Sequence, residues 1–228
     1  MPSKANTDNH TDNNTDTDTD TAIETNQKPS PFLTIPLELR LEIYTHLLTL
    51  PPSPVATTKQ TLHPAILSAN HQTHAEALPI LYTNNTFLAH PHNLTSTPQL
   101  LPTLPPITSP TNLPLVRRWR LRVRLDALPP PTWTAATLSA AFTGADELIL
   151  ELWQGAFFVA AGTVVLRLFE GVRGVRRVRF TGIGGGDGFG FGRYLAWLAR
   201  AMRKPKGSVV GEYVCGDELE RKRLCGWI

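Results

Sequence analysis

The residues best suited to chemistry lie in a glycine-rich stretch, Thr181 to Gly192, which reads TGIGGGDGFGFG. It follows a predicted strand and precedes a predicted helix, which is where a phosphate-binding loop would lie. The spacing does not fit, because Gly182 and Gly184 would require a glycine where Asp187 stands, and no other frame gives GxGxxG. We therefore expect a flexible loop here. A ligand-binding or enzymatic domain that uses loop 182–192 stays open as an alternative.

The remaining candidates for catalysis or metal binding are scattered through the sequence. No GxSxG or HExxH motif and no closely spaced acid pair occurs. His71 and His74 would share a helix face, but Cys215 and Cys225 lie far from them in the chain. We therefore predict no catalytic residue, no metal site and no cofactor, and a role in binding rather than catalysis. An enzyme whose site is assembled from distant residues stays an alternative.

Charge divides the 228 residues into an acidic and a basic part. Residues 1–116 hold 4 Lys and Arg against 9 Asp and Glu, a net −5, and residues 117–228 hold 18 against 10, a net +8, which together give +3. A basic half favours an acidic partner surface, whereas cations spread along strands and helix ends fit nucleic acid poorly. No apolar run reaches the roughly 18 residues of a membrane span, and no signal-peptide pattern opens the chain. We expect an intracellular protein, in cytoplasm or nucleus, without a membrane partner.

A helix is predicted to begin at Pro36, since proline suits the first turn of a helix. No glycine or proline follows until Pro51, which predicts a helix over Leu37 to Leu48. An apolar arc this wide indicates either deep burial or two partners, one inside the domain and one outside it. At about 100° per residue the arc consists of Leu39, Ile43, Leu47, Leu41, Tyr44 and Leu48.

A second helical segment is predicted from His63 to Leu81. Pro79 lies inside its pattern, so we expect a kink or a break there, because proline removes a backbone hydrogen bond and clashes with the preceding turn. The residues Thr86-Phe87-Leu88 then form a short extended piece. The two helical segments together predict a small helical unit.

These two segments carry a resemblance. Ile35-Pro36-x-Glu38-Leu39-x-x-x-Ile43-x-x-x-Leu47 resembles the opening of an F-box. The second segment, from Ile66-Leu67 through Ala75-Glu76-Ala77 to Asn85-Thr86-Phe87, is similar to the remainder of the F-box-like domain found in fungal proteins of unassigned function. The resemblance covers roughly a quarter of the chain.

The resemblance implies a non-enzymatic protein-interaction module. In such a protein the first helix docks a Skp-type adaptor of a cullin-based ubiquitin ligase, and the C-terminal region recruits a protein substrate. The contacts would be apolar, as in other helix-in-groove interfaces. The alternative is a structural or interaction domain that keeps the F-box-like fold without binding such an adaptor. The residues implied in adaptor binding are Ile35, Pro36, Leu39, Ile43 and Leu47.

The C-terminal part changes from helical to alternating patterns. Strands recur about every 30 residues, each followed by a helix, which is the rhythm of β/α units or of a leucine-rich-repeat-like stack. The predicted strands are Arg117–Leu125, Asp146–Trp153 and Val175–Thr181. The predicted helices are Thr132–Phe142, Phe157–Glu170 and Phe191–Arg203. The fold class is therefore α+β, a small helical unit followed by about three strands that alternate with helices.

The first of these strands has the strictest alternation. Trp119, Leu121 and Val123 point one way, and arginines point the other way. Either Glu147 and Glu151 of the next strand pair with outward arginines on the strands on either side of it, or the arginines form a second interaction face. This arginine row consists of Arg118, Arg120, Arg122 and Arg124.

Composition also marks the domain boundaries. The first part is rich in Thr, Asp and Asn and cannot bury enough apolar surface to fold. A Pro-, Thr- and Ser-rich stretch separates the two folded parts and reads as a linker or long loop. The predicted order is a disordered tail over 1–30, the F-box-like domain over 31–89, the linker or loop over 90–115, the β/α domain over 116–204 and a C-terminal tail over 205–228.

Overall fold

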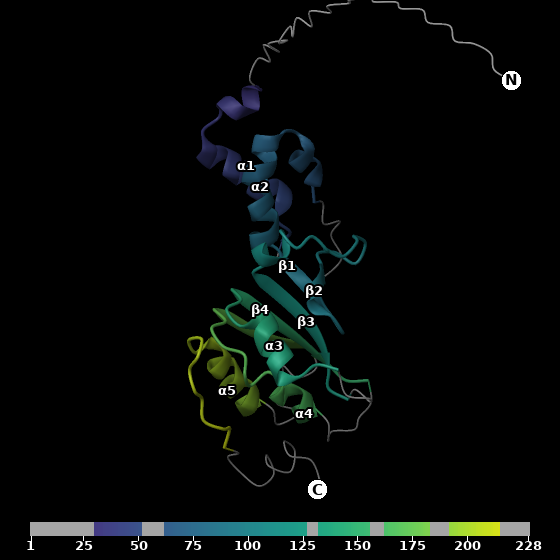
Figure 1. Cartoon of the computed structure of the whole chain (residues 1–228), viewed down its shortest axis with the longest axis vertical. Helices are drawn as coiled ribbons and strands as arrows, with labels where there is room; N and C mark the ends of the chain where they lie inside the picture. The colour runs from purple at the N-terminus through teal and green to yellow at the C-terminus, as the bar shows by residue number, and fades with distance from the viewer. Residues whose placement is uncertain (1–29, 52–61, 127–131, 156–161, 183–191, 215–228) are drawn as a thin grey trace, which may run out of the picture. The chain divides into compact units, whose positions relative to one another are not determined.

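The computed structural model describes residues 30–51, 62–126, 132–155, 162–182 and 192–214 (Figure 1). The chain divides into two units between Pro36 and Leu37. The described part of the first unit contains one 3₁₀ turn, Pro31–Thr34, in which the Thr34 hydroxyl donates to the Pro31 carbonyl at 2.6 Å. The second unit contains the helices and the sheet described below.

Two helices open the second unit. Helix α1 spans Leu37–Leu48, as predicted, and begins directly after Pro36. The second predicted helix is divided into a 3₁₀ turn, Pro64–Ser68, and helix α2, His71–Asn84. The division falls at Asn70, because its side chain accepts from the Thr73 N–H at 2.8 Å and so starts a new helix. Helix α2 continues through Pro79, so of the predicted kink or break the break is excluded.

A five-stranded mixed sheet follows α2. Its strand order is β2-β1-β3-β4-β5, with β1 and β2 antiparallel and the other neighbours parallel. The first two strands form a hairpin. Helices connect β3 to β4 and β4 to β5, whereas the connection from β1 to its parallel neighbour β3 runs through β2 and the 3₁₀ turn Leu113–Leu115. The strands are β1 Thr86–His90, β2 Leu94–Gln99, β3 Arg118–Arg124, β4 Glu147–Trp153 and β5 Arg177–Gly182.

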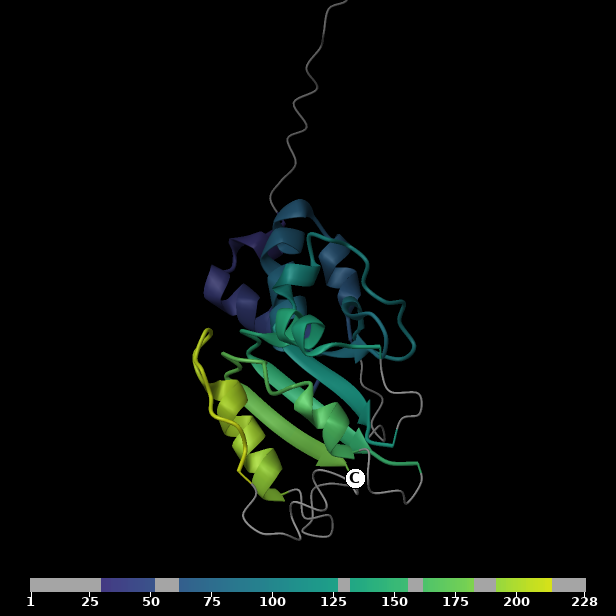
Figure 2. The ribbon, with the colours of Figure 1, turned by 60° about the horizontal axis from the view of Figure 1, so that its bottom comes forward.

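Helices α3 Ala135–Phe142, α4 Gly162–Arg167 and α5 Gly192–Arg203 follow β3, β4 and β5 in turn. Figure 2 shows these three helices on the same side of the sheet. A short 3₁₀ turn, Leu113–Leu115, precedes β3. The α+β prediction, a helical part followed by strands that alternate with helices, is confirmed. Within the described ranges, no helix has the length and apolar character needed to cross a membrane.

The core lies between the sheet and these three helices. Strand β3 buries Trp119, Leu121 and Val123, as its alternation predicts, and β4 buries every second residue from Leu148 to Leu152. Leu195, Leu198 and Met202 of α5 belong to the same buried cluster. One face of the sheet is therefore apolar and covered, and the other carries the charged side chains.

The stretch 90–115, expected to be a linker or long loop, contains β2 at Leu94–Gln99. This strand was not predicted from the sequence, because Pro98 lies inside it and a proline cannot donate a backbone hydrogen bond to a neighbouring strand. Strand β2 is at the edge of the sheet, where a residue without a backbone N–H is tolerated. Four further predictions fall outside the described residues: the 1–29 tail, most of the glycine-rich loop, the helix residues 157–161 and the end of the C-terminal tail.

Candidate protein-interaction site

Helix α1 buries an unusual stripe against α2. Arg40, Tyr44 and Leu48 are the buried residues of this helix, and they follow one another at intervals of four, so they share one face. Tyr44 and Leu48 are completely buried, and Arg40 is only 6% exposed. The side of α1 that anchors it in the fold thus contains a cation.

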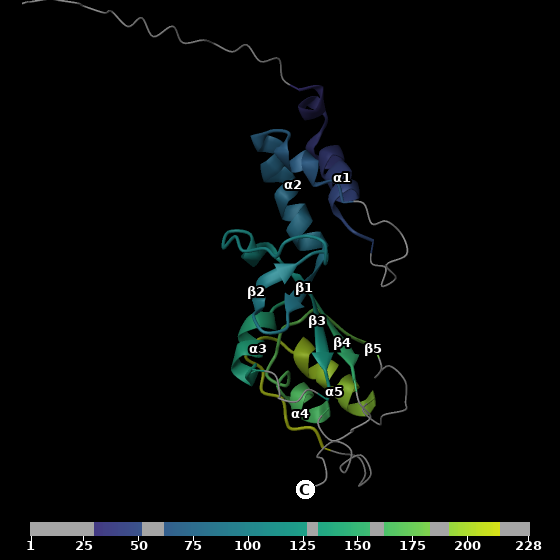
Figure 3. The same cartoon turned by 90° about the vertical axis from the view of Figure 1, so that its right-hand side faces the viewer.

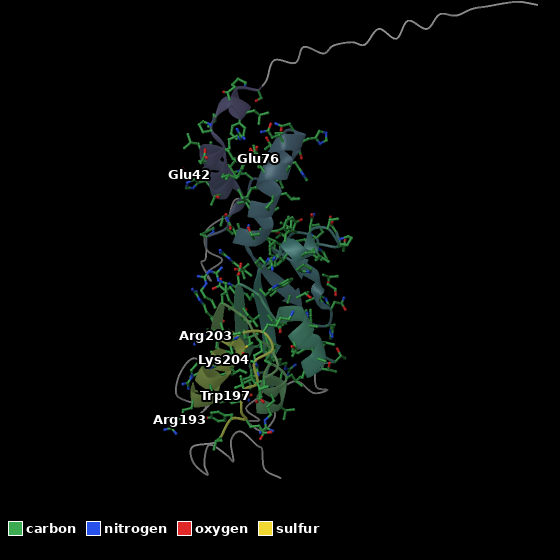
Figure 4. The ribbon with its side chains drawn as sticks, turned by 60° about the vertical axis from the view of Figure 1, so that its left-hand side comes forward. Glu42, Glu76, Arg193, Trp197, Arg203 and Lys204 are labelled. Carbon is green, nitrogen blue, oxygen red and sulfur yellow. The ribbon has the colours of Figure 1, made fainter. Side chains whose placement is uncertain are left out.

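Arg40 is neutralised by Glu76 of α2. Its Nε donates to Glu76 Oε2 at 2.9 Å and its Nη2 to Glu76 Oε1 at 2.7 Å, which is the bidentate geometry of the strongest arginine–carboxylate pairs. The Tyr44 hydroxyl donates to the same carboxylate at 3.0 Å and the Gln72 amide at 2.9 Å. Figure 4 shows Glu76 on the side of α2 that is next to α1. Three donors of α1 therefore lock the two helices together, and the Gln72 amide adds a fourth bond to Glu76 within α2.

These contacts change the ionisation of the network. Hydrogen bonds from Arg40 and Gln72 lower the pKa of Glu76 from 4.5 to about 2. The hydrogen bond to Glu76 raises the pKa of Arg40 above its ordinary value, and burial raises the pKa of Tyr44. The ion pair is therefore fully charged at neutral pH.

A second polar residue fixes the other end of α1. Asn85 follows α2 and is only 1% exposed. Its side-chain oxygen accepts from the Leu50 N–H at 2.8 Å, and its amide donates to the carbonyls of Leu48 at 2.6 Å and Leu81 at 2.8 Å. The ends of both helices are therefore satisfied by one side chain, which holds α1 at a fixed place beside α2.

With its anchoring side occupied by Arg40 and Tyr44, α1 leaves leucines in solvent. Leu37 is 45% exposed, Leu39 51% and Leu41 36%. Among the described residues only one other leucine, Leu104, is exposed to a similar degree, at 38%. The exposed leucines of the described chain are therefore concentrated in the first five residues of α1. They do not form one face, because at about 100° per residue Leu37 and Leu41 lie about 40° apart while Leu39 lies about 160° from Leu41.

The five residues implied in adaptor binding are distributed over the two units. Ile35 and Pro36 belong to the first unit, and Leu39, Ile43 and Leu47 lie on α1 in the second. These last three lie four residues apart and form one flank of α1, which we call the α1 flank. Exposure decreases along it, from Leu39 at 51% to the half-buried Ile43 and Leu47.

Sequence reasoning missed Arg40, Glu76 and the side-chain role of Asn85. Arg40 and Glu76 are 36 residues apart, so no local pattern connects them. A signal was present nonetheless: Arg40 stands four residues before Tyr44 and eight before Leu48, in line with the residues that the helix buries. A cation in a buried stripe requires a carboxylate partner on the neighbouring helix.

The predicted arginine row lies on the uncovered face of the sheet. Its expected pairing with the neighbouring strands is confirmed: Arg122 lies 3.6 Å from Glu151, and Glu147 pairs with Arg179 of β5 at 3.3 Å. Arg124 pairs instead with Asp126 at 3.0 Å and lies over the Trp153 ring, 5.2 Å from its centroid. The row is thus partly paired.

The glycine-rich stretch is described only at its two ends. Gly182 ends β5 with φ of +94°, and a Cβ there would overlap the carbonyl oxygen of Leu152, so a glycine is required for strand pairing. Gly192 begins α5. The described ranges contain no group of three side chains able to hold a metal ion.

Comparison of the chain with protein-family models, with curated proteins and with solved structures finds no match. Function is therefore inferred from the residues and their geometry. The α1 flank is the strongest candidate for an interaction site, because it runs from the exposed Leu39 to the half-buried Ile43 and Leu47 on a helix that the Arg40–Glu76 pair and Asn85 anchor.

Proposed function

We propose that this chain is a non-enzymatic protein-interaction module of F-box-like type. In this proposal the α1 flank docks a Skp-type adaptor of a cullin-type ubiquitin ligase, and the β/α region holds the protein to be presented. The proposal places the chain inside the cell, in cytoplasm or nucleus, where such ligases act. No cofactor takes part.

The exposure of Leu39 carries the proposal. Leu39 is 51% exposed on a helix that is fixed by the Arg40–Glu76 pair and by Asn85. Fully burying a leucine side chain contributes about 1.5–3 kcal/mol. A partner groove that covered Leu39 would gain part of this energy without reordering the helix, because the helix is already in place.

Co-purification of the full chain with a Skp-type adaptor tests the proposal. Leu39→Asp places a charge in the apolar interface, and we expect it to abolish capture. Thr45→Asp is the matched control, because it adds the same charge to an exposed site about 120° around the helix from Leu39 by the helical projection. Thr45→Asp should bind like the wild type. Circular dichroism of each variant confirms that the chain is folded.

Two outcomes contradict the proposal. Failure of the folded wild type to bind would favour the alternative, an interaction domain with the F-box-like fold that does not bind such an adaptor. Equal loss of binding in Leu39→Asp and Thr45→Asp would show that the α1 flank has no special role. The double variant Leu39→Asp/Ile43→Asp extends the test along the flank if the single change only weakens binding.

A further inference from the structure

The face of the sheet turned away from α3, α4 and α5 is strongly basic, and we call it the open face. The register places Arg118, Glu147 and Arg177 in one row across the strands, and Arg120, Ile149 and Arg179 in a second row. Figure 3 shows the sheet close to edge-on, with α3 and α4 on one side of it. The cations of the open face are Arg118, Arg120, Arg122, Arg124, Arg177 and Arg179.

Carboxylates on this face neutralise only half of these arginines. Glu147, Glu151 and Asp126 pair with Arg179, Arg122 and Arg124 respectively, so six cations less three anions leave a net charge of +3. The paired arginines also keep much of their surface in solvent, with the Arg122 side chain 60% exposed and that of Arg179 58%.

The three remaining arginines lie near the beginning of the parallel strands. Arg118 donates to the Asn84 carbonyl at 2.9 Å, but its Nε is buried without a hydrogen-bond partner. Within the described ranges Arg120 and Arg177 make no side-chain hydrogen bond or ion pair. Half-buried Ile149 lies between Arg120 and Arg179 in the register. In the register, Arg118 and Arg177 flank Glu147, and Arg120 is the neighbour of Ile149. Three guanidinium groups without a described carboxylate partner beside an apolar residue form a surface complementary to an acidic segment.

We infer that the open face binds an acidic segment of a partner protein, whose carboxylates pair with Arg118, Arg120 and Arg177. The planar fork of arginine matches a carboxylate in two parallel hydrogen bonds. In an extended segment, side chains two residues apart point the same way and lie about 7 Å apart, which is also the repeat of arginines along β3. This inference rests on the proposed function and deepens it. The acidic segment would belong to the protein that the chain presents to the ubiquitin ligase.

Two observations favour an acidic protein over nucleic acid. Glu147 and Glu151 lie among the arginines and interrupt the cationic surface, which fits separate carboxylates along a peptide better than the continuous charge of a phosphate backbone. Single-stranded nucleic acid also needs aromatic rings on which bases stack. Trp153, an exposed aromatic residue on this face, already has the Arg124 guanidinium over its ring.

The test is a fluorescence-anisotropy titration of the full chain against a labelled ten-residue peptide of alternating Glu and Thr. Arg120→Gln/Arg177→Gln removes two charges that have no described partner, and we expect it to weaken binding at least tenfold. Arg193→Gln/Arg200→Gln is the matched control. This control removes two charges from α5, which packs on the covered face; Arg193 is labelled in Figure 4. The affinity of this control variant for the peptide should stay within twofold of the wild type.

Several results would overturn the inference. The first two are no binding of the Glu-Thr peptide by the wild type and an equal loss of peptide affinity in the two double variants. The third is an affinity for a Gln-Thr peptide equal to that for the Glu-Thr peptide. The fourth is tighter binding of a ten-nucleotide oligo-dT than of the peptide, which would assign the face to nucleic acid. The titration contains no Skp-type adaptor. The Leu39→Asp variant should therefore bind the peptide like the wild type. A failure of the adaptor proposal appears only in the co-purification, and a failure of the acidic-segment proposal appears only in the peptide titration.

Discussion

The helical pair and the sheet distribute charge in opposite ways. Helix α1 buries Arg40 at 6% exposure and leaves Leu39 51% exposed. Strand β3 buries Leu121 completely and leaves the Arg122 side chain 60% exposed. The sheet follows the usual rule of apolar residues inside and charged residues outside, and α1 departs from it at Arg40 and Leu39.

This difference separates what each region needs for folding from what it offers to a partner. In the sheet, the apolar face provides the core, and the arginines that have no described carboxylate partner are available to an acidic ligand. In the helical pair, the Arg40–Glu76 pair and Asn85 provide the anchor, and the leucines are free. On a helix that is otherwise fixed, the half-exposed Leu39 is available to a partner, and this is the feature on which the proposed function relies.

The largest expected difference between the two regions is in the free energy of unfolding that is lost when a leucine is replaced by alanine. Leu150→Ala removes a completely buried side chain from β4 and should lower the free energy of unfolding by about 2–5 kcal/mol. Leu39→Ala should change it by no more than about 0.5 kcal/mol, because Leu39 is largely in solvent. Urea unfolding followed by circular dichroism measures both. Similar losses for the two variants would mean that Leu39 is covered by its own chain.

The second comparison is between arginines. Arg40→Gln leaves the Glu76 carboxylate without its bidentate partner, so it should destabilise the fold clearly. Arg122→Gln breaks an open pair with one contact at 3.6 Å and should cost only about 0–1 kcal/mol. Thermal unfolding of both variants gives the ranking. The neutral double variant Arg40→Met/Glu76→Leu should recover part of the loss, and a further loss instead would contradict this account.

How much of this could be read from the sequence depends on the range of the interactions. The α1 helix and the burial of Trp119, Leu121 and Val123 were predictable, because helical and alternating periodicity are local. Strand β2 was missed, since Pro98 is acceptable only at a sheet edge and sequence alone does not show which strand is at an edge. The Arg40–Glu76 pair was missed because it joins residues from different helices.

The smallest predicted effect is a pH dependence confined to the helical pair. The pKa of Glu76 is lowered to about 2 from 4.5, so its ion pair stabilises the fold fully above pH 4.5, and this contribution is lost as the pH falls towards 2. The stability difference between the wild type and Glu76→Gln should therefore narrow over this range. Unfolding measured at a series of pH values checks this, and a constant difference would contradict the assignment.

Hydrogen–deuterium exchange of the full chain, with and without a Skp-type adaptor, tests the central claim most directly. If the α1 flank is a docking surface on a helix that is already anchored, the adaptor should slow amide exchange across Leu37–Leu48. Exchange in the strands β3, β4 and β5 should stay unchanged. Leu39→Asp should remove this protection. Unchanged exchange in α1, or protection that appears in the sheet instead, would contradict the claim that the α1 flank is the adaptor-binding site.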